Sequence, residues 1–540
     1  MTTAVEVIAA ALHRAGCRTA FGIPGGEILA MMHALDECGI RFALCKHENA
    51  GGFMAEGTHH ATSAPGILVA TIGPGLANGI NTVVNAWQDQ VPLIVLSGCI
   101  DGAEAQTYTH QVFDHAQLMR PITKASFLAA DGAVDVIAEK AVALAMADPQ
   151  GPVHIDIPVS LAEKTQPPAR RSTVPAASPT GPAAGEDLSR AASMLAGAQR
   201  PLVVAGVGAV AHEAGPALQA LCEQYGAPLL TTYKAKGLLP EDHPLSLGGH
   251  GLSPKSDAIV LPLLARSDCV ILAGYDPIEM RAGWYDPWAA ENAIEISHFA
   301  IRHGMHGAAV VFACNVTAGL EALSTAAQAV SAPDSDLAWP GGEPSRARAD
   351  LQQAFSPPEA WGPHQAFAAA RRASPRETVI TADSGAHRIL LSQMWLCYEP
   401  RGMLQSSALC TMGVALPLAM GYKLAAPDRP VLAVMGDAGL EMVAGELATL
   451  RDLKMPLAVL VMVDRSLALI ELKQRSAGRA NLGVEFGATD FAALAEAMGG
   501  AGRDIHSVSD MERELSAAYE RDRFTLLACH IGPNAYDRAF

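Results

Sequence analysis

Short runs of apolar residues recur along the chain, and glycine-rich or acidic turns follow many of them. The runs 430–435 and 457–463 predict buried parallel strands, and a segment with apolar residues at helical spacing lies between them. The turns after these strands read GDAG (436–439) and DRS (464–466). Because a parallel βαβ unit brings both carboxyl ends to one edge of the sheet, we expect the aspartates of both turns to face one ligand site.

The same alternation of strand, glycine turn and helix divides the chain into three parts. We predict α/β domains over residues 1–165, 187–327 and 364–535, each doubly wound around a mainly parallel sheet. Residues 166–186, rich in Pro, Ala, Ser and Thr, and residues 328–363 are typical of interdomain linkers, the second partly helical. The first and third parts share a rhythm that indicates related architectures.

Composition narrows the class of protein. Of 540 residues, 50% are hydrophobic and 17% charged, which suits about three folded domains and excludes a disordered chain. The net charge of −17, without a run of Lys or Arg, argues against a nucleic-acid partner. Ten single cysteines without a C-x-x-C pair indicate free thiols in a reducing compartment. Without a signal peptide or a long apolar stretch, we expect a cytoplasmic protein with no membrane partner.

The two acidic turns combine features that suit a diphosphate held through a divalent cation. Gly436, Ala438 and Gly439 let backbone N–H groups approach phosphate oxygens at a helix N-terminus. Asp437 and Asp464 supply the hard oxygen ligands that Mg²⁺ prefers. The alternative is a βαβ unit with ordinary aspartate caps. One such turn favours that alternative, whereas two turns at this spacing favour the metal site.

This segment resembles the diphosphate- and metal-binding motif of thiamine-diphosphate (ThDP) enzymes, usually Gly-Asp-Gly followed downstream by Asn. Here Ala438 and Asp464 depart from that pattern, and aspartate at the second place is found in the acetolactate synthase group. The resemblance implies ThDP and Mg²⁺ as cofactors, with the Ser466 carbonyl as a further metal ligand. It also places Leu467 and Ala468 in the cofactor-binding set.

A second motif follows the predicted strand 42–45 and reads KHEN (46–49). Together with Gly73 and the turn that it begins, it resembles the pyrimidine-binding domain of acetolactate synthase and its relatives. There a glutamate pairs with N1′ of the aminopyrimidine and promotes removal of the thiazolium C2 proton. The resemblance assigns this role to Glu48. A partly exposed residue near a helix N-cap is the alternative that the residue types alone leave open.

The resemblance extends over almost the whole chain. It places the turn after strand 378–382 against the diphosphate, and a surface-loop histidine is the alternative for the last residue of that turn. It implies that Met412 wedges the cofactor into a V shape, with the Cys410 carbonyl facing the 4′-amino group, although residue type alone would place Met412 in the core. The residues of the turn are Ser384, Gly385, Ala386 and His387.

The first domain is expected to supply the substrate side of the site. Pro24 and Gly25 resemble the loop near the reacting carbon, and Gln111 matches a glutamine at the mouth of the family's active site. Glu27 stands where the family usually has a small residue. A surface helix start is the simpler interpretation for Glu27, and a change of substrate pocket is the other. Two further polar groups, for which loop histidines are the simpler interpretation, are His110 and His115.

The central domain departs most from the family. Acetohydroxyacid synthases hold FAD there, but the strand ends 274–277 and 295–298 lack the expected ribose and phosphate partners. The Gly-Val-Gly turn 206–208 is a weak dinucleotide signal by itself. We therefore predict that FAD is absent.

Together these features predict an acetolactate synthase-like enzyme. It would decarboxylate a small 2-oxo acid such as pyruvate and then perform carboligation. The alternatives are a decarboxylase that releases an aldehyde, a lyase acting on an acyloin, and an inert ThDP-binding regulatory protein. Because the family builds its site across a subunit interface, the resemblance also implies a homodimer or a homotetramer.

Overall fold

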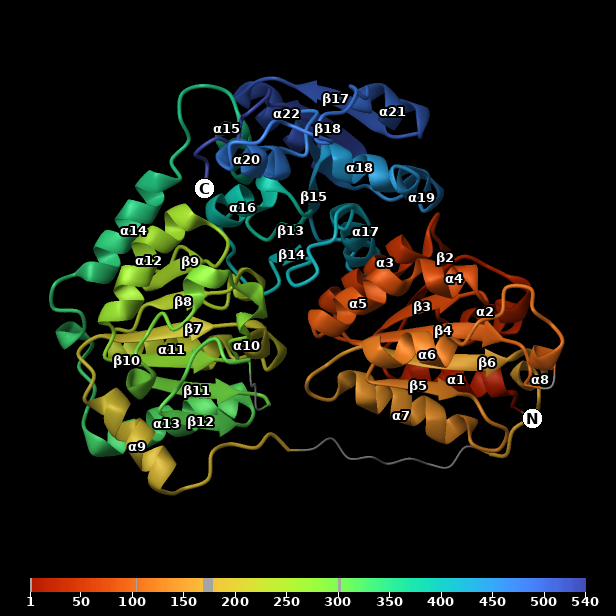
Figure 1. Cartoon of the computed structure of the whole chain (residues 1–540), viewed down its shortest axis with the longest axis horizontal. Helices are drawn as coiled ribbons and strands as arrows, with labels where there is room; N and C mark the ends of the chain where they lie inside the picture. The colour runs from red at the N-terminus through yellow and green to blue at the C-terminus, as the bar shows by residue number, and fades with distance from the viewer. Residues whose placement is uncertain (1, 103, 169–177, 300–302) are drawn as a thin grey trace.

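Three six-stranded sheets organise the chain (Figure 1). The structure, a computed structural model, describes residues 2–102, 104–168, 178–299 and 303–540. Within these ranges all strand pairs in the three sheets are parallel, so the predicted α/β class with doubly wound parallel sheets is confirmed. The exact limits of the three domains stay predictions, and residues 169–177 of the predicted first linker lie outside the described ranges.

The first sheet has the strand order β2-β1-β3-β4-β6-β5. Its central strands are buried on both faces because helices cover both sides. Its strands are β1 (Thr19–Gly22), β2 (Arg41–Leu44), β3 (Gly66–Ala70), β4 (Leu93–Cys99), β5 (Ala125–Leu128) and β6 (Val153–Pro158). Its main helices are α1 (Ala4–Arg14), α2 (Leu29–Glu37), α3 (Glu48–Thr62), α4 (Pro74–Asn78), α5 (Ile80–Gln88), α6 (His115–Met119) and α7 (Val134–Met146).

The third sheet repeats the order of the first, β14-β13-β15-β16-β18-β17. The shared rhythm seen in the sequence therefore reflects a shared topology. Its strands are β13 (Val379–Ala382), β14 (Met403–Gln405), β15 (Val431–Gly436), β16 (Ala458–Val463), β17 (Ala501–Ile505) and β18 (Thr525–His530). Its helices are α15 (Pro363–Ala373), α16 (Ala386–Met394), α17 (Ala415–Ala425), α18 (Asp437–Val443), α19 (Glu446–Asp452), α20 (Ala468–Ser476), α21 (Phe491–Ala497) and α22 (Val508–Glu520).

The central sheet has the order β12-β11-β10-β7-β8-β9, which is the dinucleotide-binding order of doubly wound folds. Helix α14 (Glu343–Ala354) packs on this domain, so much of the predicted second linker is ordered helix. The strands are β7 (Pro201–Ala205), β8 (Leu229–Thr231), β9 (Ser246–Gly249), β10 (Cys269–Ala273), β11 (Ala293–Ser297) and β12 (Val310–Ala313). The other main helices are α9 (Glu186–Ala196), α10 (Val207–Ala211), α11 (Gly215–Tyr225), α12 (Pro254–Arg266) and α13 (Val316–Val330).

Helices α3 and α17 join the first and third domains, and they lie side by side in Figure 1. A Cβ added at Gly57 would lie 2.3 Å from the carbonyl oxygen of Leu418, and one at Gly421 would lie 1.8 Å from that of Met54. The two backbones therefore approach closely only because both positions lack a side chain. Apolar side chains around this crossing form one core cluster shared by both domains.

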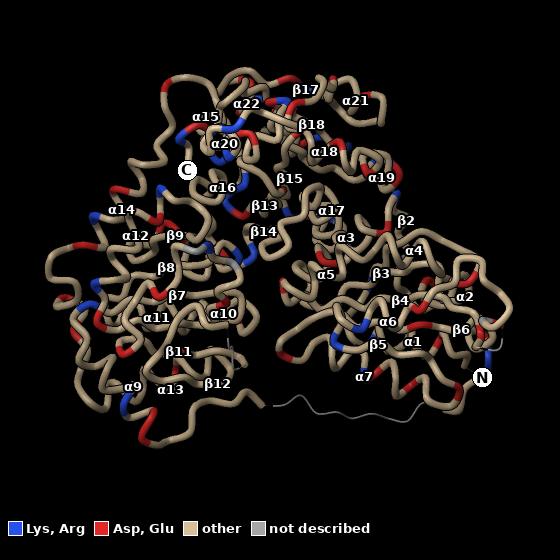
Figure 2. The backbone as a smooth tube through the Cα atoms, in the orientation of Figure 1, with Lys and Arg blue, Asp and Glu red and all other residues tan. Residues whose placement is uncertain are grey.

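Surface chemistry agrees with the composition. Figure 2 shows Lys and Arg interspersed with Asp and Glu over all three domains. All ten cysteines are free, as predicted. Within the described ranges, no helix combines the length and the apolar character needed to cross a bilayer.

The crossing of α3 and α17 yields a stability prediction. Gly421→Ala should lower the free energy of unfolding by about 1–3 kcal/mol, because the new methyl group forces the helices apart. Urea denaturation measures the change. Gly445→Ala is the control, since its Cβ would make only an ordinary 3.5 Å contact with Lys46. Equal stability of the two variants would show that the crossing is not a tight constraint.

Candidate active site

A cavity of about 180 Å³ opens at the carboxyl edge of the third sheet, beyond the ends of β13, β15 and β16. All of the third-domain residues predicted at the cofactor line it together. They are Ser384, Gly385, Ala386, His387, Cys410, Met412, Gly436, Asp437, Ala438, Gly439, Asp464, Ser466, Leu467 and Ala468. The first residues of α16, α18 and α20 are among them, so three helix N-termini lie at the cavity, where they can bind an anion.

Two aspartates face one another across neighbouring strand ends. One carboxylate oxygen of Asp437 accepts hydrogen bonds from the backbone N–H groups of Asp464 and Arg465, at 3.0 and 2.6 Å. Burial raises the pKa of Asp437. Burial, followed by the negative charge of Asp437, raises the pKa of Asp464 to about 7. Within the described ranges no Lys, Arg or His forms an ion pair with either carboxylate, so a divalent cation fits this pair of oxygen donors.

Asp383 organises the opposite wall of the cavity. It is fully buried, and it accepts hydrogen bonds from the backbone N–H groups of Gly413 and Val414, at 3.0 and 2.8 Å. These bonds fix the turn that carries Met412. A Cβ at Gly439 would lie 1.9 Å from an Asp383 oxygen, so only glycine fits where α18 passes this carboxylate. Burial raises the pKa of Asp383 to about 6.

His387 is buried, so the surface-loop alternative for it is wrong. The His387 ring lies between two glycine turns. Its Nδ1 would be 2.8 Å from a Cβ placed at Gly385 and 3.4 Å from a Cβ placed at Gly436. Its Nε2 has no hydrogen-bond partner among the described residues. Burial, followed by the charge of Arg388, lowers the pKa of His387 to about 3, which keeps the ring neutral.

Glu48 lies in the first domain and does not line this cavity. It begins α3, is 4% exposed, and accepts a hydrogen bond from the Asn78 amide at 3.0 Å. The preceding turn is bound to the third domain, because the N–H groups of Lys46 and His47 donate to Glu446 at 2.9 and 3.2 Å. Glu48 is therefore a buried and oriented carboxyl group, not a partly exposed residue near a helix cap.

The other predicted first-domain residues also lie outside that cavity. The N–H of Gly73 donates to His115 Nε2 at 3.2 Å, and Nδ1 of the same ring lies 3.1 Å from Asp156. His115 is buried, so its interpretation as a loop histidine is wrong, whereas His110 is exposed as expected. Gln111 is exposed and has a φ of +60°. Its carbonyl oxygen lies so close to Gly73 that a Cβ at Gly73 would touch it.

Glu27 is held in place instead of pointing freely into solvent. It is half-buried, and its carboxylate accepts a hydrogen bond from Thr71 Oγ1 at 2.8 Å, at the carboxyl end of β3. The loop before Glu27 is closely packed, since a Cβ at Gly25 would lie 2.0 Å from Thr71 Oγ1. Pro24, in the same loop, is exposed. In the described part of the chain, no cationic side chain pairs with Glu27.

Protein side chains cover the glycine turn of the central domain. Nδ1 of His298 would lie 2.5 Å from a Cβ at Gly208. Gln90 of the first domain bonds to both strand ends, through Asp276 at 3.0 Å and through His298 at 2.9 Å. These contacts agree with the altered strand ends seen in the sequence, and the absence of FAD stays a prediction.

Three residues that shape the site were not predicted from the sequence. Asp383 and Glu446 are buried carboxylates that accept backbone N–H bonds from turns far away in the chain, and Tyr536 lines the cavity. An aspartate at the end of β13 was the available signal for the first. The other two depend on tertiary contacts that no local pattern shows.

Family models describe the same three-part organisation. Models of the N-terminal, central and C-terminal domains of thiamine pyrophosphate enzymes match residues 2–118, 188–326 and 383–529. A "probable 2-ketoarginine decarboxylase" of Pseudomonas aeruginosa is 31% identical over 97% of this chain and 93% of its own length. An acetolactate synthase large subunit of Parasynechococcus marenigrum is 30% identical over 97% of this chain and 87% of its own. An acetolactate synthase of Bacillus subtilis is 29% identical over 93% of this chain and 88% of its own.

Removing one carboxylate of the acidic pair should stabilise the fold, although the same carboxylate is predicted to bind the metal. In metal-free protein, Asp464→Asn should raise the free energy of unfolding by about 1–3 kcal/mol at pH 8. Folding raises the pKa of the Asp464 carboxyl group to about 7. The free energy of unfolding therefore falls as the pH rises from 4 to 7, and asparagine removes that loss. Urea denaturation at pH 5 and pH 8 measures the difference. Asp36→Asn, at an exposed site, is the control, and a gain that does not grow with pH would contradict the assignment.

Proposed function

The chain belongs to the thiamine pyrophosphate enzyme family, and from that premise we propose that it decarboxylates a small 2-oxo acid with ThDP and Mg²⁺ and then performs carboligation, as acetolactate synthases do. It is a ThDP-dependent carboligase or decarboxylase. The proposal rests on the third-domain cavity, where two unneutralised carboxylates and three helix N-termini meet.

The third domain would bind the diphosphate end of the cofactor. Asp437, Asp464 and the Ser466 carbonyl would hold Mg²⁺, whose charge would neutralise the acidic pair and favour the binding of a diphosphate. The N-termini of α16 and α20 would bind the remaining phosphate oxygens. Met412, on the turn that Asp383 fixes, would support the thiazolium ring. When bound, ThDP would supply a nucleophilic carbon for the substrate carbonyl and an electron sink for the loss of CO₂.

The first domain would supply the side chain that transfers the proton. Glu48 would hold a proton at its carboxyl group, in a hydrogen bond to N1′ of the aminopyrimidine, and the Asn78 amide orients that carboxyl group. Pro24, Gly25, Gly73 and Gln111 would line the substrate side. None of these residues lines the cavity of its own chain, which supports a site shared by two copies. We therefore include a homodimer, or a homotetramer built from it, in the proposal.

Glu27 favours a second candidate, the simple decarboxylation of a 2-oxo acid with a cationic side chain. Its carboxylate has one hydrogen bond and no cationic partner among the described residues, so it can accept a guanidinium or ammonium group. The similarity to a protein named for 2-ketoarginine agrees with such a substrate. Pyruvate has no group for Glu27, so the two candidates differ at this residue.

Glu48→Gln tests the proposed reaction. ThDP binding should persist, because the side chain keeps its size and can still pair with the ring. CO₂ release from the preferred 2-oxo acid should fall at least 100-fold, because the variant cannot move the proton. Glu37→Gln, at an exposed site, should behave as the parent protein. Normal turnover by Glu48→Gln would refute the assigned role, and no CO₂ release from any 2-oxo acid by the parent protein would favour a lyase or an inert protein.

Glu27→Gln separates the two substrates. If a cationic 2-oxo acid is the substrate, kcat/KM for 2-ketoarginine should fall about 10–100-fold, because a charge-assisted bond is lost, while kcat/KM for pyruvate changes less. Product mass then identifies either an aldehyde or a ligated hydroxy acid. If both substrates respond equally, Glu27 does not select the charge of the substrate.

A further inference from the structure

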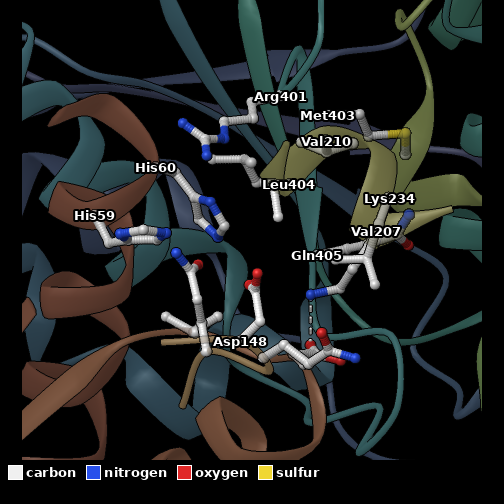
Figure 3. Close-up of a pocket in the computed structure, with 15 residues that line it drawn as sticks. His59, His60, Asp148, Val207, Val210, Lys234, Arg401, Met403, Leu404 and Gln405 are labelled. Carbon is white, nitrogen blue, oxygen red and sulfur yellow. Dashed lines mark ion pairs between the residues drawn. The ribbon is translucent and has the colours of Figure 1, made fainter. Parts of the chain in front are cut away.

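A second cavity lies where the three domains of one chain meet (Figure 3). Its walls come from α3 of the first domain, from α10 and the short helix η4 (Tyr233–Ala235) of the central domain, and from residues 401–405 of the third, which include β14. None of its lining residues lines the candidate active site. It is therefore a separate place in the molecule, and the proposed reaction does not use it.

Gln405 is the first sign that this cavity takes a ligand. Its side chain lines the cavity, and the residue is 2% exposed. Neither the amide nitrogen nor the amide oxygen has a hydrogen-bond partner among the described residues. A buried amide with both ends unpaired is unfavourable, and native proteins rarely keep one without a reason. A bound group that accepts from one end or donates to the other would satisfy it.

Arg401 gives the sign of the charge that the cavity can bind. One of its nitrogens donates to Ser63 Oγ at 3.0 Å, and no carboxylate of the described chain pairs with the guanidinium. The other cation of the wall, Lys234, is paired with Asp89 at 2.9 Å. Arg401 is therefore the cation that remains for a ligand, and a planar guanidinium matches the geometry of a carboxylate.

His60 offers a third polar contact. Its Nδ1 has no partner among the described residues, while its Nε2 lies 3.4 Å from Glu56. Burial, followed by the charge of Arg401, lowers the pKa of His60 well below 6.5, so the ring is neutral. A neutral ring can hydrogen-bond a hydroxyl or carbonyl group without adding charge to the cavity.

Size and charge narrow the class of ligand. The cavity measures about 50 Å³, and one water needs roughly 10–15 Å³ of such space, so it has room for about three to five water-sized groups, which limits the ligand to a small acid. Asp148 lies across the cavity from Arg401 in Figure 3 and accepts a hydrogen bond from His212 at 2.8 Å. Its negative charge disfavours a dianion such as phosphate. Asp148 is also exposed, which leaves a route to solvent.

We propose that this junction cavity binds a small monocarboxylate with a polar group on the neighbouring carbon, namely a 2-hydroxy or 2-oxo acid. Arg401 binds the carboxylate, and Gln405, assisted by His60, binds the second polar group. Because all three domains line the cavity, its occupant stabilises their arrangement and gives the enzyme a regulatory site for acids of the same chemical class as its proposed substrate.

Titration calorimetry of the holoenzyme with lactate tests the proposal. Lactate lacks the carbonyl group that the proposed reaction needs, so the probe is not consumed. We expect one lactate per chain, with binding at least tenfold weaker in Arg401→Gln and in Gln405→Met. Arg372→Gln is the control, since Arg372 is exposed and pairs with Glu512, and it should bind lactate as the parent protein does.

The Gln405→Met variant adds a readout that does not depend on activity. Without lactate its Tm should rise by about 1–3 °C, because methionine fills the same space without an unpaired amide. Lactate should then no longer raise the Tm. The proposal is overturned if the parent protein does not bind lactate, if both variants bind it normally, if inorganic phosphate binds more tightly than lactate, or if Gln405→Met lowers the Tm.

Discussion

The candidate site depends on two negative charges that are held close together at neighbouring strand ends. Asp437 and Asp464 directly follow β15 and β16, which pair in parallel, so the backbone itself brings their carboxylates together. No cationic side chain of the described chain neutralises them, and burial makes the uncompensated pair costly. The surrounding turns, with glycines packed against Asp383 and His387, leave room for an ion and a phosphate where side chains would otherwise lie.

The glycine crossing of α3 and α17 sets a second constraint. It holds the first and third domains of one chain in contact, yet Glu48 does not reach the acidic cavity of that chain. In the proposed homodimer, a second copy with the same two carboxyl edges would supply the counterpart of each. The shared strand order of the first and third sheets makes such a pairing pseudo-symmetric.

Local patterns in the sequence predicted much of the fold and the two acidic turns of the third-domain cavity, whereas the resemblance to ThDP enzymes placed residues 384–387, Cys410 and Met412 there. Continuous apolar runs mark β15 and β16, and parallel connection alone brings their aspartates to one edge. The burial of His115 and His387 could not be predicted, because it depends on distant partners such as Asp156 and on two glycine turns packing around a ring. Glu446 was missed for the same reason, since it binds a turn 400 residues away. The cofactor and proton-transfer roles of these residues rest on the family resemblance.

Mixing two inactive variants tests the central claim, that one site is built from Glu48 of one copy and Asp437 of another. Glu48→Gln and Asp437→Ala chains are purified separately, unfolded and refolded together, and CO₂ release from the preferred 2-oxo acid is measured. Random pairing of shared sites gives half the dimers one intact site, so activity should recover to about a quarter of the parent value. If each chain built its own site, the mixture would stay as inactive as either variant alone, and the account would be contradicted.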